Sequence, residues 1–499
     1  MHAPHRKTVH WAALAGLGAL WALAALGALA SKGAHAAPAD DEAARRSGAA
    51  HLITAPNASG VAATLNLAGP IDRNNPFFQS LGSNGRSCAT CHLAQEGWTI
   101  TPKGVRERFE ASHGLEPIFR LNDGANSPLA DVSTRAARKL AYSMLLDKGL
   151  IRVGIGVPAG AQFELVQVDD PYGFASAKEL SLFRRPLPTT NLRFINTVMW
   201  DGRETFRSAT STDCIFGTLT CFAPLHFNLT DQSNAATVGH AQAVAPLSEA
   251  QRDAIVAFEL GLFTAQISDR DAGRLSTHGA HGGPSFASTQ ESYFGINDVL
   301  VGDYRTHAAF TPDVMRLYGA WSNYIPDARR PDEEGRDRDV AVARRAVARG
   351  QALFNNKPIL ISGVKGINDD LNIATLPGTC TTCHNTPNAG NHSIPMPLDI
   401  GIADASRRTP DLPLYTLRNK QTGALIETTD PGRALVTGKW QDIGRFKGPT
   451  LRALAARAPY FHNGAAADLP TVVKFYNDRF SIGFSEDEQR DLVSFLKAL

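Results

Sequence analysis

Three stretches in the last third of the chain place hydrophobic residues at helical spacing. They carry Val340, Ala343, Val347 and Phe354 in the first stretch, Leu469, Val472, Val473 and Tyr476 in the second, and Leu492, Phe495, Leu496 and Leu499 in the third. Asp468 precedes the second stretch as an N-cap, and Ser485 with Glu488 forms a capping box before the third. We therefore expect an amphipathic helix over 340–354 and two capped helices at the end of the chain. Between residues 384 and 445 prolines interrupt the pattern, which predicts loops.

The first two thirds of the chain predict fewer helices and one small hairpin. A helix is expected over 133–148, ended by Gly149, and another after the capping box of Ser248 and Gln251. The alternating stretches 150–155 and 163–168 flank a Pro-Ala-Gly turn, which predicts a β-hairpin. The pattern as a whole predicts a mainly α fold.

The first 36 residues have the form of an export signal. Arg6 and Lys7 precede an apolar run from Trp11 to Ala30, and Ala34-His35-Ala36 is a small-x-small cleavage site. Because the run is long enough to span a bilayer, an uncleaved membrane anchor is the alternative. We expect a periplasmic protein that contacts the membrane only if this segment is retained.

Composition and charge divide the remaining chain into two folded parts. The 499 residues exceed one usual domain. A run rich in charges and breakers at 329–336 predicts a linker, so we expect one domain over 50–330 and a second over 338–499. With 50 basic against 48 acidic residues, the chain has no charge excess that would favour nucleic acid.

Four of the six cysteines stand in two copies of one motif. Cys88 and Cys91 are followed by His92, and Cys380 and Cys383 are followed by His384. This Cys-x-x-Cys-His pattern is typical of covalent c-type haem attachment, in which both thiols bind the porphyrin and the histidine binds the iron. A zinc site or a thioredoxin-like pair are the alternatives, but neither requires the trailing histidine. In an oxidising compartment the remaining pair, Cys214 and Cys221, predicts a structural disulfide.

Further motifs resemble one family of haem proteins. Two separated haem motifs, Trp200-Asp201-Gly202-Arg203 between them, Phe446 to Arg452 and Pro459-Tyr460-Phe461-His462-Asn463-Gly464 resemble the di-haem cytochrome c peroxidase and MauG family. The resemblance implies two cytochrome c-like haem domains, the first enlarged by insertions over 101–179 and 206–330. It also implies that hydrogen peroxide reacts at the N-terminal haem and that the C-terminal haem relays electrons.

The resemblance also suggests roles for individual residues. Trp200 is the expected electron bridge between the haems, and an ordinary core tryptophan is the alternative. Tyr476 lies fourteen residues after His462, where peroxidases of the family have a methionine and the MauG branch a tyrosine that binds the second iron. Packing on its helix face is the alternative for Tyr476. Met396 and His392 are weaker candidate ligands.

At the first haem the resemblance requires groups that move protons. Gln232 and His240 occupy the stretch where family members place Gln and Glu, and a neutral imidazole can carry a proton. A surface or core histidine is the alternative for His240, and His113 is an alternative distal ligand. Calcium between the domains is also implied. The asparagine that helps to bind calcium is missing from the stretch 184–189, which leaves the carbonyls of Arg457 and Pro459 as donors.

Four functions are compatible with these motifs. The leading hypothesis is an exported di-haem oxidoreductase that uses hydrogen peroxide, and it includes two of these functions. A peroxidase would take electrons from a small electron-donor protein, and a MauG-like enzyme would take them from a protein substrate. A non-enzymatic di-haem electron-transfer cytochrome is the alternative. A haem oxygenase resembling rubber-cleaving enzymes is suggested only by the insertions.

The motifs predict two covalently bound haems per chain. Replacing Cys88 and Cys91 by alanine should remove one haem, and replacing Cys380 and Cys383 should remove the other, because each pair supplies both thioether bonds. Replacing Cys214 and Cys221 should leave both. A pyridine haemochrome assay measures the count, and one haem or none in the wild type would contradict the assignment.

Overall fold

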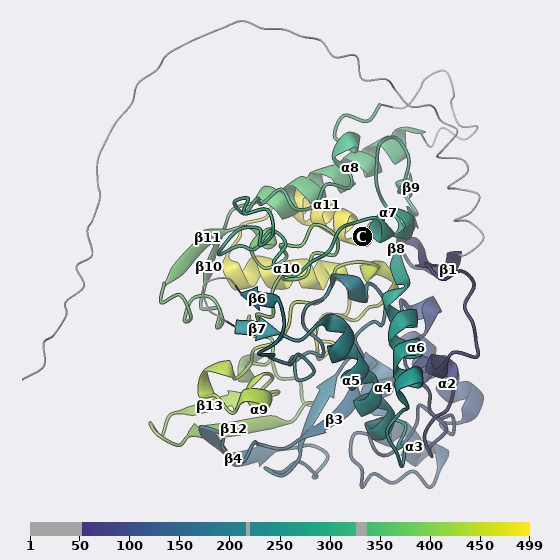
Figure 1. Ribbon diagram of the computed structural model, residues 1–499, viewed down its shortest axis with the longest axis vertical. Helices are drawn as coiled ribbons and strands as arrows, with labels where there is room; N and C mark the ends of the chain where they lie inside the picture. The colour runs from purple at the N-terminus through teal and green to yellow at the C-terminus, as the bar shows by residue number, and fades with distance from the viewer. Residues whose placement is uncertain (1–51, 216–219, 326–336) are drawn as a thin grey trace, which may run out of the picture. The chain divides into compact units, whose positions relative to one another are not determined.

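Figure 1 shows the computed structural model of the chain, which describes residues 52–215, 220–325 and 337–499. The expected export signal over 1–36 and the expected linker over 329–336 lie outside the described residues. The described residues form one compact unit. The division into domains over 50–330 and 338–499 stays a prediction.

Most of the expected helices form where their caps predicted them. The helices of the described residues are α2 Pro102–Ser112, α3 Arg135–Ala141, α4 Ser143–Lys148, α5 Leu225–Gly239, α6 Glu249–Leu260, α7 Pro284–Ser288, α8 Asp337–Asn356, α9 Ala434–Thr437, α10 Leu469–Phe480 and α11 Glu486–Lys497. The helix expected over 133–148 is interrupted at Tyr142 and becomes α3 and α4, and Gly149 ends α4 in the left-handed conformation. The capping box of Ser248 and Gln251 is confirmed at α6.

The three helices expected near the C-terminus pack on one another. Helices α8, α10 and α11 lie together (Figure 1). Asp468 accepts a hydrogen bond from the Thr471 amide at the start of α10, and Ser485 with Glu488 caps α11. Their apolar faces meet in one core. Local sequence was sufficient here because caps and helical periodicity act within a few residues.

The prediction of a mainly α fold is wrong. The described residues contain five small sheets, ordered β1-β2-β8-β9, β10-β11, β13-β12-β4, β3-β5 and β6-β7. Their strands are β1 Leu52–Asn57, β2 Gly60–Asn66, β3 Ile151–Ile155, β4 Phe163–Asp169, β5 Leu180–Arg184, β6 Asp213–Ile215, β7 Thr220–Phe222, β8 Leu262–Asp269, β9 Gly273–Arg274, β10 Ile359–Ser362, β11 Thr375–Gly378, β12 Leu414–Asn419 and β13 Leu425–Thr428. The arrangement therefore does not reduce to two helical, cytochrome c-like domains.

The expected hairpin is also wrong, although both of its strands exist. Strand β3 pairs with β5, and β4 pairs with β12 from the other half of the chain. Figure 1 shows β12 and β13 beside β4. Phe163 of β4 packs in one core with Tyr415 and Leu417 of β12. An alternating pattern identifies a strand, but its partner is chosen by packing between distant segments, which the local pattern does not contain.

The expected disulfide is confirmed between Cys214 and Cys221, which face each other across the pair β6 and β7. Among the residues that the structure describes, no helix combines the length and the apolar character needed to cross a membrane.

A buried ion-pair cluster joins the two halves of the chain. Arg184, at the end of β5, pairs with Asp430 at 2.7 Å and with Asp201 at 2.5 Å. Asp201 also pairs with Arg203. Burial acts to raise the pKa of Asp201, but the charges of Arg184 and Arg203 outweigh it and hold that pKa at about 2. The cluster fixes Asp201, and with it the Trp-Asp-Gly-Arg segment, against the C-terminal half.

Replacing Arg184 by alanine should lower the free energy of unfolding by about 3–5 kcal/mol, because buried Asp430 would lose its ion-pair partner and buried Asp201 one of its two. Chemical denaturation measures the change. The matched control is Arg305→Ala, whose pair with Glu291 is exposed and should contribute little. Equal effects of the two substitutions would contradict the role given to Arg184.

The same cluster predicts sensitivity to acid. Because the pKa of Asp201 is lower in the folded chain than the usual value of about 3.9 in an unfolded one, its ion pairs stabilise the protein above about pH 4. That contribution should be lost as the pH falls from about 4 to 2. The unfolding free energy of Arg184→Ala should depend less on pH over this range than that of the wild type.

Candidate functional site

Each Cys-x-x-Cys-His motif lines its own cavity. The first cavity, of about 1520 Å³ with its open mouth included, is bordered by Cys88, Cys91 and His92. The second, of about 1770 Å³, is bordered by Cys380, Cys383 and His384. Apolar side chains form much of each lining, as is usual for a cofactor site. Each motif therefore borders an open, largely apolar space.

The two motif histidines are oriented in the same way. The Nδ1 atom of His92 lies 3.0 Å from the Trp98 carbonyl oxygen, and that of His384 lies 2.5 Å from the Gly390 carbonyl oxygen. Since a carbonyl only accepts, each Nδ1 must donate its proton, which leaves the lone pair on Nε2. This is the arrangement that an iron-binding histidine needs, with its other nitrogen held by the protein.

The motif cysteines have the local geometry of attachment sites. Short 3-10 helices at Cys88–Thr90 and Cys380–Thr382 bring the two sulfurs of each motif into one turn, and all four thiols are free of disulfides. Burial raises the pKa of the thiols of Cys88, Cys380 and Cys383 to about 12. A redox-active Cys-x-x-Cys pair instead has a lowered thiol pKa. The residues present therefore fit covalent haem better than a thioredoxin-like site.

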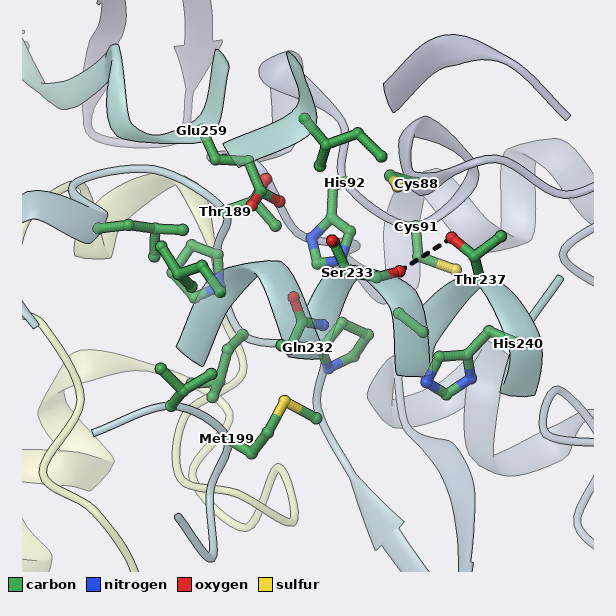
Figure 2. Close-up of a pocket in the computed structure, with 18 of the residues that line it drawn as sticks. Cys88, Cys91, His92, Thr189, Met199, Gln232, Ser233, Thr237, His240 and Glu259 are labelled. Atoms are coloured by element: carbon green, nitrogen blue, oxygen red, sulfur yellow. Dashed lines mark hydrogen bonds between the residues drawn. The ribbon is translucent and has the colours of Figure 1, made fainter. Parts of the chain in front are cut away.

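The predicted proton-moving residues meet in the first cavity. Gln232 lies on α5 and His240 caps its C-terminus, and both line the same cavity as His92. Figure 2 shows them on one helix, while His92 and the two cysteines come from a separate segment. By contrast, His113 is the exposed C-cap of α2 and is not among the residues that line either cavity.

Asp123 was not predicted, yet it orients His240. Its Oδ2 lies 2.5 Å from Nδ1 of His240, and its other oxygen pairs with Arg86. Burial acts to raise the pKa of Asp123, but the hydrogen bond to His240 and the charge of Arg86 lower it overall. An ionised Asp123 accepts a hydrogen bond from Nδ1–H of His240, which leaves the lone pair on Nε2 free to exchange a proton. Asp123 comes from a loop more than a hundred residues before His240, so no local pattern could have indicated it.

A second carboxyl in the first cavity was also missed. Glu259 lies on α6 and is 3% exposed, and its Oε2 has no hydrogen-bond partner within the described part of the chain. Burial raises the pKa of Glu259 to about 8. The sequence did carry a signal, because Glu259 interrupts the apolar face formed by Ile255, Phe258 and Leu262.

One wall separates the two cavities, and Trp200 is part of it. Both cavities are lined by Arg185, Pro186, Leu187, Pro188, Trp200 and Lys447. The Trp200 indole donates a hydrogen bond to the Arg185 carbonyl at 2.7 Å, and its ring lies 6.2 Å from the ring of His462, which lines the second cavity. Trp200 therefore occupies the place that an electron bridge would need.

Tyr476 and His392 both line the second cavity with His384. Met396 packs against the same apolar cluster as the motif cysteines and is absent from the lining. Burial raises the pKa of the Tyr476 phenol, and the nearby thiols of Cys383 and Cys380 act in the same direction. The Ile394 amide donates to Nδ1 of His392, which places the proton of the neutral ring on Nε2 and makes that atom a donor. Of the two cavity residues, Tyr476 is the better candidate for an iron ligand.

The residues present do not fit a calcium ion between the halves. The Arg457 carbonyl, one of the expected donors, already accepts a hydrogen bond from the guanidinium of Arg185 at 3.1 Å. Since that guanidinium is cationic, it would repel a calcium ion at the same oxygen.

Comparison with known proteins identifies relatives of this chain. No family model matches it. Over 209 residues it is 29% identical to the cytochrome-c peroxidase IdrP1 of Denitromonas iodatirespirans. This alignment covers 38% of this chain and 50% of the relative. Over 123 residues it is 42% identical to the cytochrome c551 peroxidase of Nitrosomonas europaea, an alignment that covers 24% of this chain and 30% of the relative. The chain is related to the cytochrome c peroxidases. The resemblance seen in the motifs is thereby confirmed at the level of the family.

The extent of these matches is limited. The chain spans half the length of IdrP1 and less of the other curated relatives that it matches, among them IdrP2 of the same organism at 31% identity over 141 residues. A solved structure of a MauG-like protein associated with microbial copper homeostasis aligns with 85% of this chain and 87% of that one, at 14% identity and a TM-score of 0.35.

Substitution of Tyr476 tests its assignment as a ligand of the second haem. Tyr476→Met should raise the potential of that haem and shift its spectrum toward His/Met ligation, because a neutral sulfur replaces an anionic oxygen. Tyr476→Phe should leave the position open or admit another ligand. Spectroelectrochemistry of the holoprotein measures both effects.

The matched control is Tyr460→Phe, in the same cavity, whose hydroxyl donates to the Leu454 carbonyl. It should change neither the potential nor the ligand-field bands. Unchanged potentials and bands in both Tyr476 variants would show that Tyr476 is a packing residue.

Proposed function

We propose that this chain is a di-haem c-type oxidoreductase that reduces hydrogen peroxide in the first cavity and receives electrons through the second. The observation that carries the proposal is the shared wall, in which Trp200 lies between the two Cys-x-x-Cys-His cavities. The printed names of the curated relatives, which are cytochrome c peroxidases, support the same chemistry.

The haems would be held by the chain's own motifs. Cys88 and Cys91 would bind the first porphyrin and Cys380 and Cys383 the second, with Nε2 of His92 and His384 directed at the irons. When bound, the haems supply the redox-active iron and a position where peroxide can bind. Arg185, Lys447 and Arg457 are buried, and in the described part of the chain the hydrogen bonds of their side chains are to carbonyl oxygens, not carboxylates. The two guanidinium groups, and Lys447 when it is protonated, would stabilise the anionic propionates of the porphyrins.

His240 is the proposed proton carrier. Reduction of hydrogen peroxide breaks its O–O bond and consumes two electrons and two protons to give two waters. With Nδ1 fixed by Asp123, the Nε2 atom of His240 can accept a proton from one peroxide oxygen and return it to the other. Gln232, two turns earlier on the same helix, would hydrogen-bond the oxidant.

Trp200 and the second haem would supply the electrons. Trp200 is held through its side chain and its main chain, since the Arg185 carbonyl accepts from the indole Nε1 and the Trp200 carbonyl accepts from the Lys447 amide at 2.8 Å. A small electron-donor protein would reduce the second haem. The export signal expected over 1–36 and the disulfide between Cys214 and Cys221 support a periplasmic site for the reaction.

One observation favours a second candidate, a MauG-like enzyme that oxidises a protein substrate. Tyr476 lines the second cavity, and a phenolate ligand favours higher oxidation states of iron than a thioether does. In that case the electrons would come from the side chains of the substrate instead of a carrier protein.

Spectroscopy distinguishes an enzyme from an electron-transfer cytochrome. The electron paramagnetic resonance spectrum should contain a high-spin ferric signal, at rest or after reduction by one electron, and this signal should change with cyanide and with peroxide. If neither reagent altered the spectrum in any redox state, the electron-transfer cytochrome would be the correct assignment.

Replacing His240 by glutamine should slow the reaction with peroxide by about 10²- to 10⁴-fold, the usual contribution of a general acid–base group. Asp123→Asn should have a smaller effect because it changes only the orientation of the imidazole. Stopped-flow mixing of the holoprotein with peroxide measures the rate. His226→Gln, an exposed histidine on the same helix, is the control and should react like the wild type.

A further inference from the structure

The side chain of Arg185 lies where a cation is expected between the two halves of the chain. Its guanidinium donates to three carbonyl oxygens, of Ile100 at 2.7 Å, Lys148 at 3.0 Å and Arg457 at 3.1 Å. The residue is 5% exposed. Backbone carbonyl oxygens are among the ligands that calcium takes, and here three of them accept from an arginine.

The main chain of Arg185 holds two aromatic residues, Trp200 and His462. Its amide donates to the His462 carbonyl at 2.7 Å, and its carbonyl accepts the Trp200 indole at 2.7 Å. The guanidinium thus links segments near residues 100, 148 and 457, while the peptide groups of the same residue hold Trp200 and His462. The position of Trp200 depends on this one residue from several directions.

The charge of Arg185 persists in this environment. Burial lowers its pKa to about 10, with a smaller contribution from the nearby charge of Arg457, so the guanidinium remains protonated at neutral pH. In the part of the chain that the structure describes, no carboxylate lies within ion-pair distance of it, and Glu96 is the acidic group that acts on it from further away. The wall therefore contains a fixed positive charge.

We infer that the guanidinium of Arg185 takes the place of a calcium ion in this wall, so that the chain holds Trp200 between its cavities without any bound metal there. The role of Trp200 rests on the proposed function. The replacement of calcium by Arg185 does not, since it follows from the contacts of the carbonyl oxygens.

Calcium binding by the isolated holoprotein is the first test. Metal analysis after desalting should find no stoichiometric calcium, and isothermal titration with calcium chloride should give no binding at one site per chain. The thermal unfolding midpoint should be the same in excess EGTA and in millimolar calcium. One bound calcium per chain together with a midpoint that EGTA lowers would overturn the inference.

Substitution of Arg185 is the second test. Arg185→Ala should unfold at a lower temperature than Arg106→Ala, a control in which an exposed arginine also loses a carbonyl contact, to Leu146. Low millimolar guanidinium or calcium should raise the midpoint of Arg185→Ala, because three carbonyl oxygens would be left to bind a cation, whereas equal ionic strength of sodium chloride should not. An Arg185→Ala midpoint equal to that of Arg106→Ala would overturn the inference.

If Arg185→Ala does not accumulate, Arg185→Lys provides the same test. The lysine keeps the positive charge but lacks the planar guanidinium that donates to three carbonyl oxygens. The thermal unfolding midpoint of Arg185→Lys should therefore fall below that of Arg106→Lys. An equal midpoint would overturn the inference. Neither test uses peroxide turnover. A holoprotein without peroxidase activity would contradict the proposed function and leave the calcium result standing, and a calcium-dependent peroxidase would do the reverse.

Discussion

The buried ion pairs of Arg184 with Asp201 and Asp430 are the interaction on which the rest of the site depends. All three side chains are 4% exposed or less, so none could be buried without the others. Strand β5 ends at Arg184, the wall residues Arg185–Pro188 follow directly, and Asp201 stands next to Trp200. One cluster of charges therefore sets the position of the wall relative to both haem motifs.

The wall combines rigidity with positive charge. Arg185 and Lys447 face both cavities, and burial lowers the pKa of Lys447 to about 7. Arg185 is charged at neutral pH, and a nearby anion such as a porphyrin propionate would also keep the proton on Lys447, whereas a free metal ion would be repelled. The two motif histidines are fixed independently by their own carbonyl partners. The orientation of the motif histidines is thus independent of the contacts that hold Trp200.

Local signals predicted the helices and the haem motifs but not the contacts between distant segments. Asp468 and the box of Ser485 and Glu488 cap helices as expected because capping involves neighbouring residues. The pairing of β4 with β12 and the hydrogen bond of Asp123 to His240 join residues far apart in sequence, so no spacing rule indicates them. The mainly α expectation failed for the same reason, since short strands become recognisable only with their partners.

Electron transfer across the wall is the central claim, and a stopped-flow experiment with the fully reduced holoprotein and one equivalent of hydrogen peroxide tests it most directly. Peroxide takes two electrons, so each haem should lose one, and in the wild type both should be oxidised together. In Trp200→Phe, with two haems still bound, oxidation of the second haem should become slower than that of the first. Equal rates of second-haem oxidation in the variant and the wild type would contradict the account.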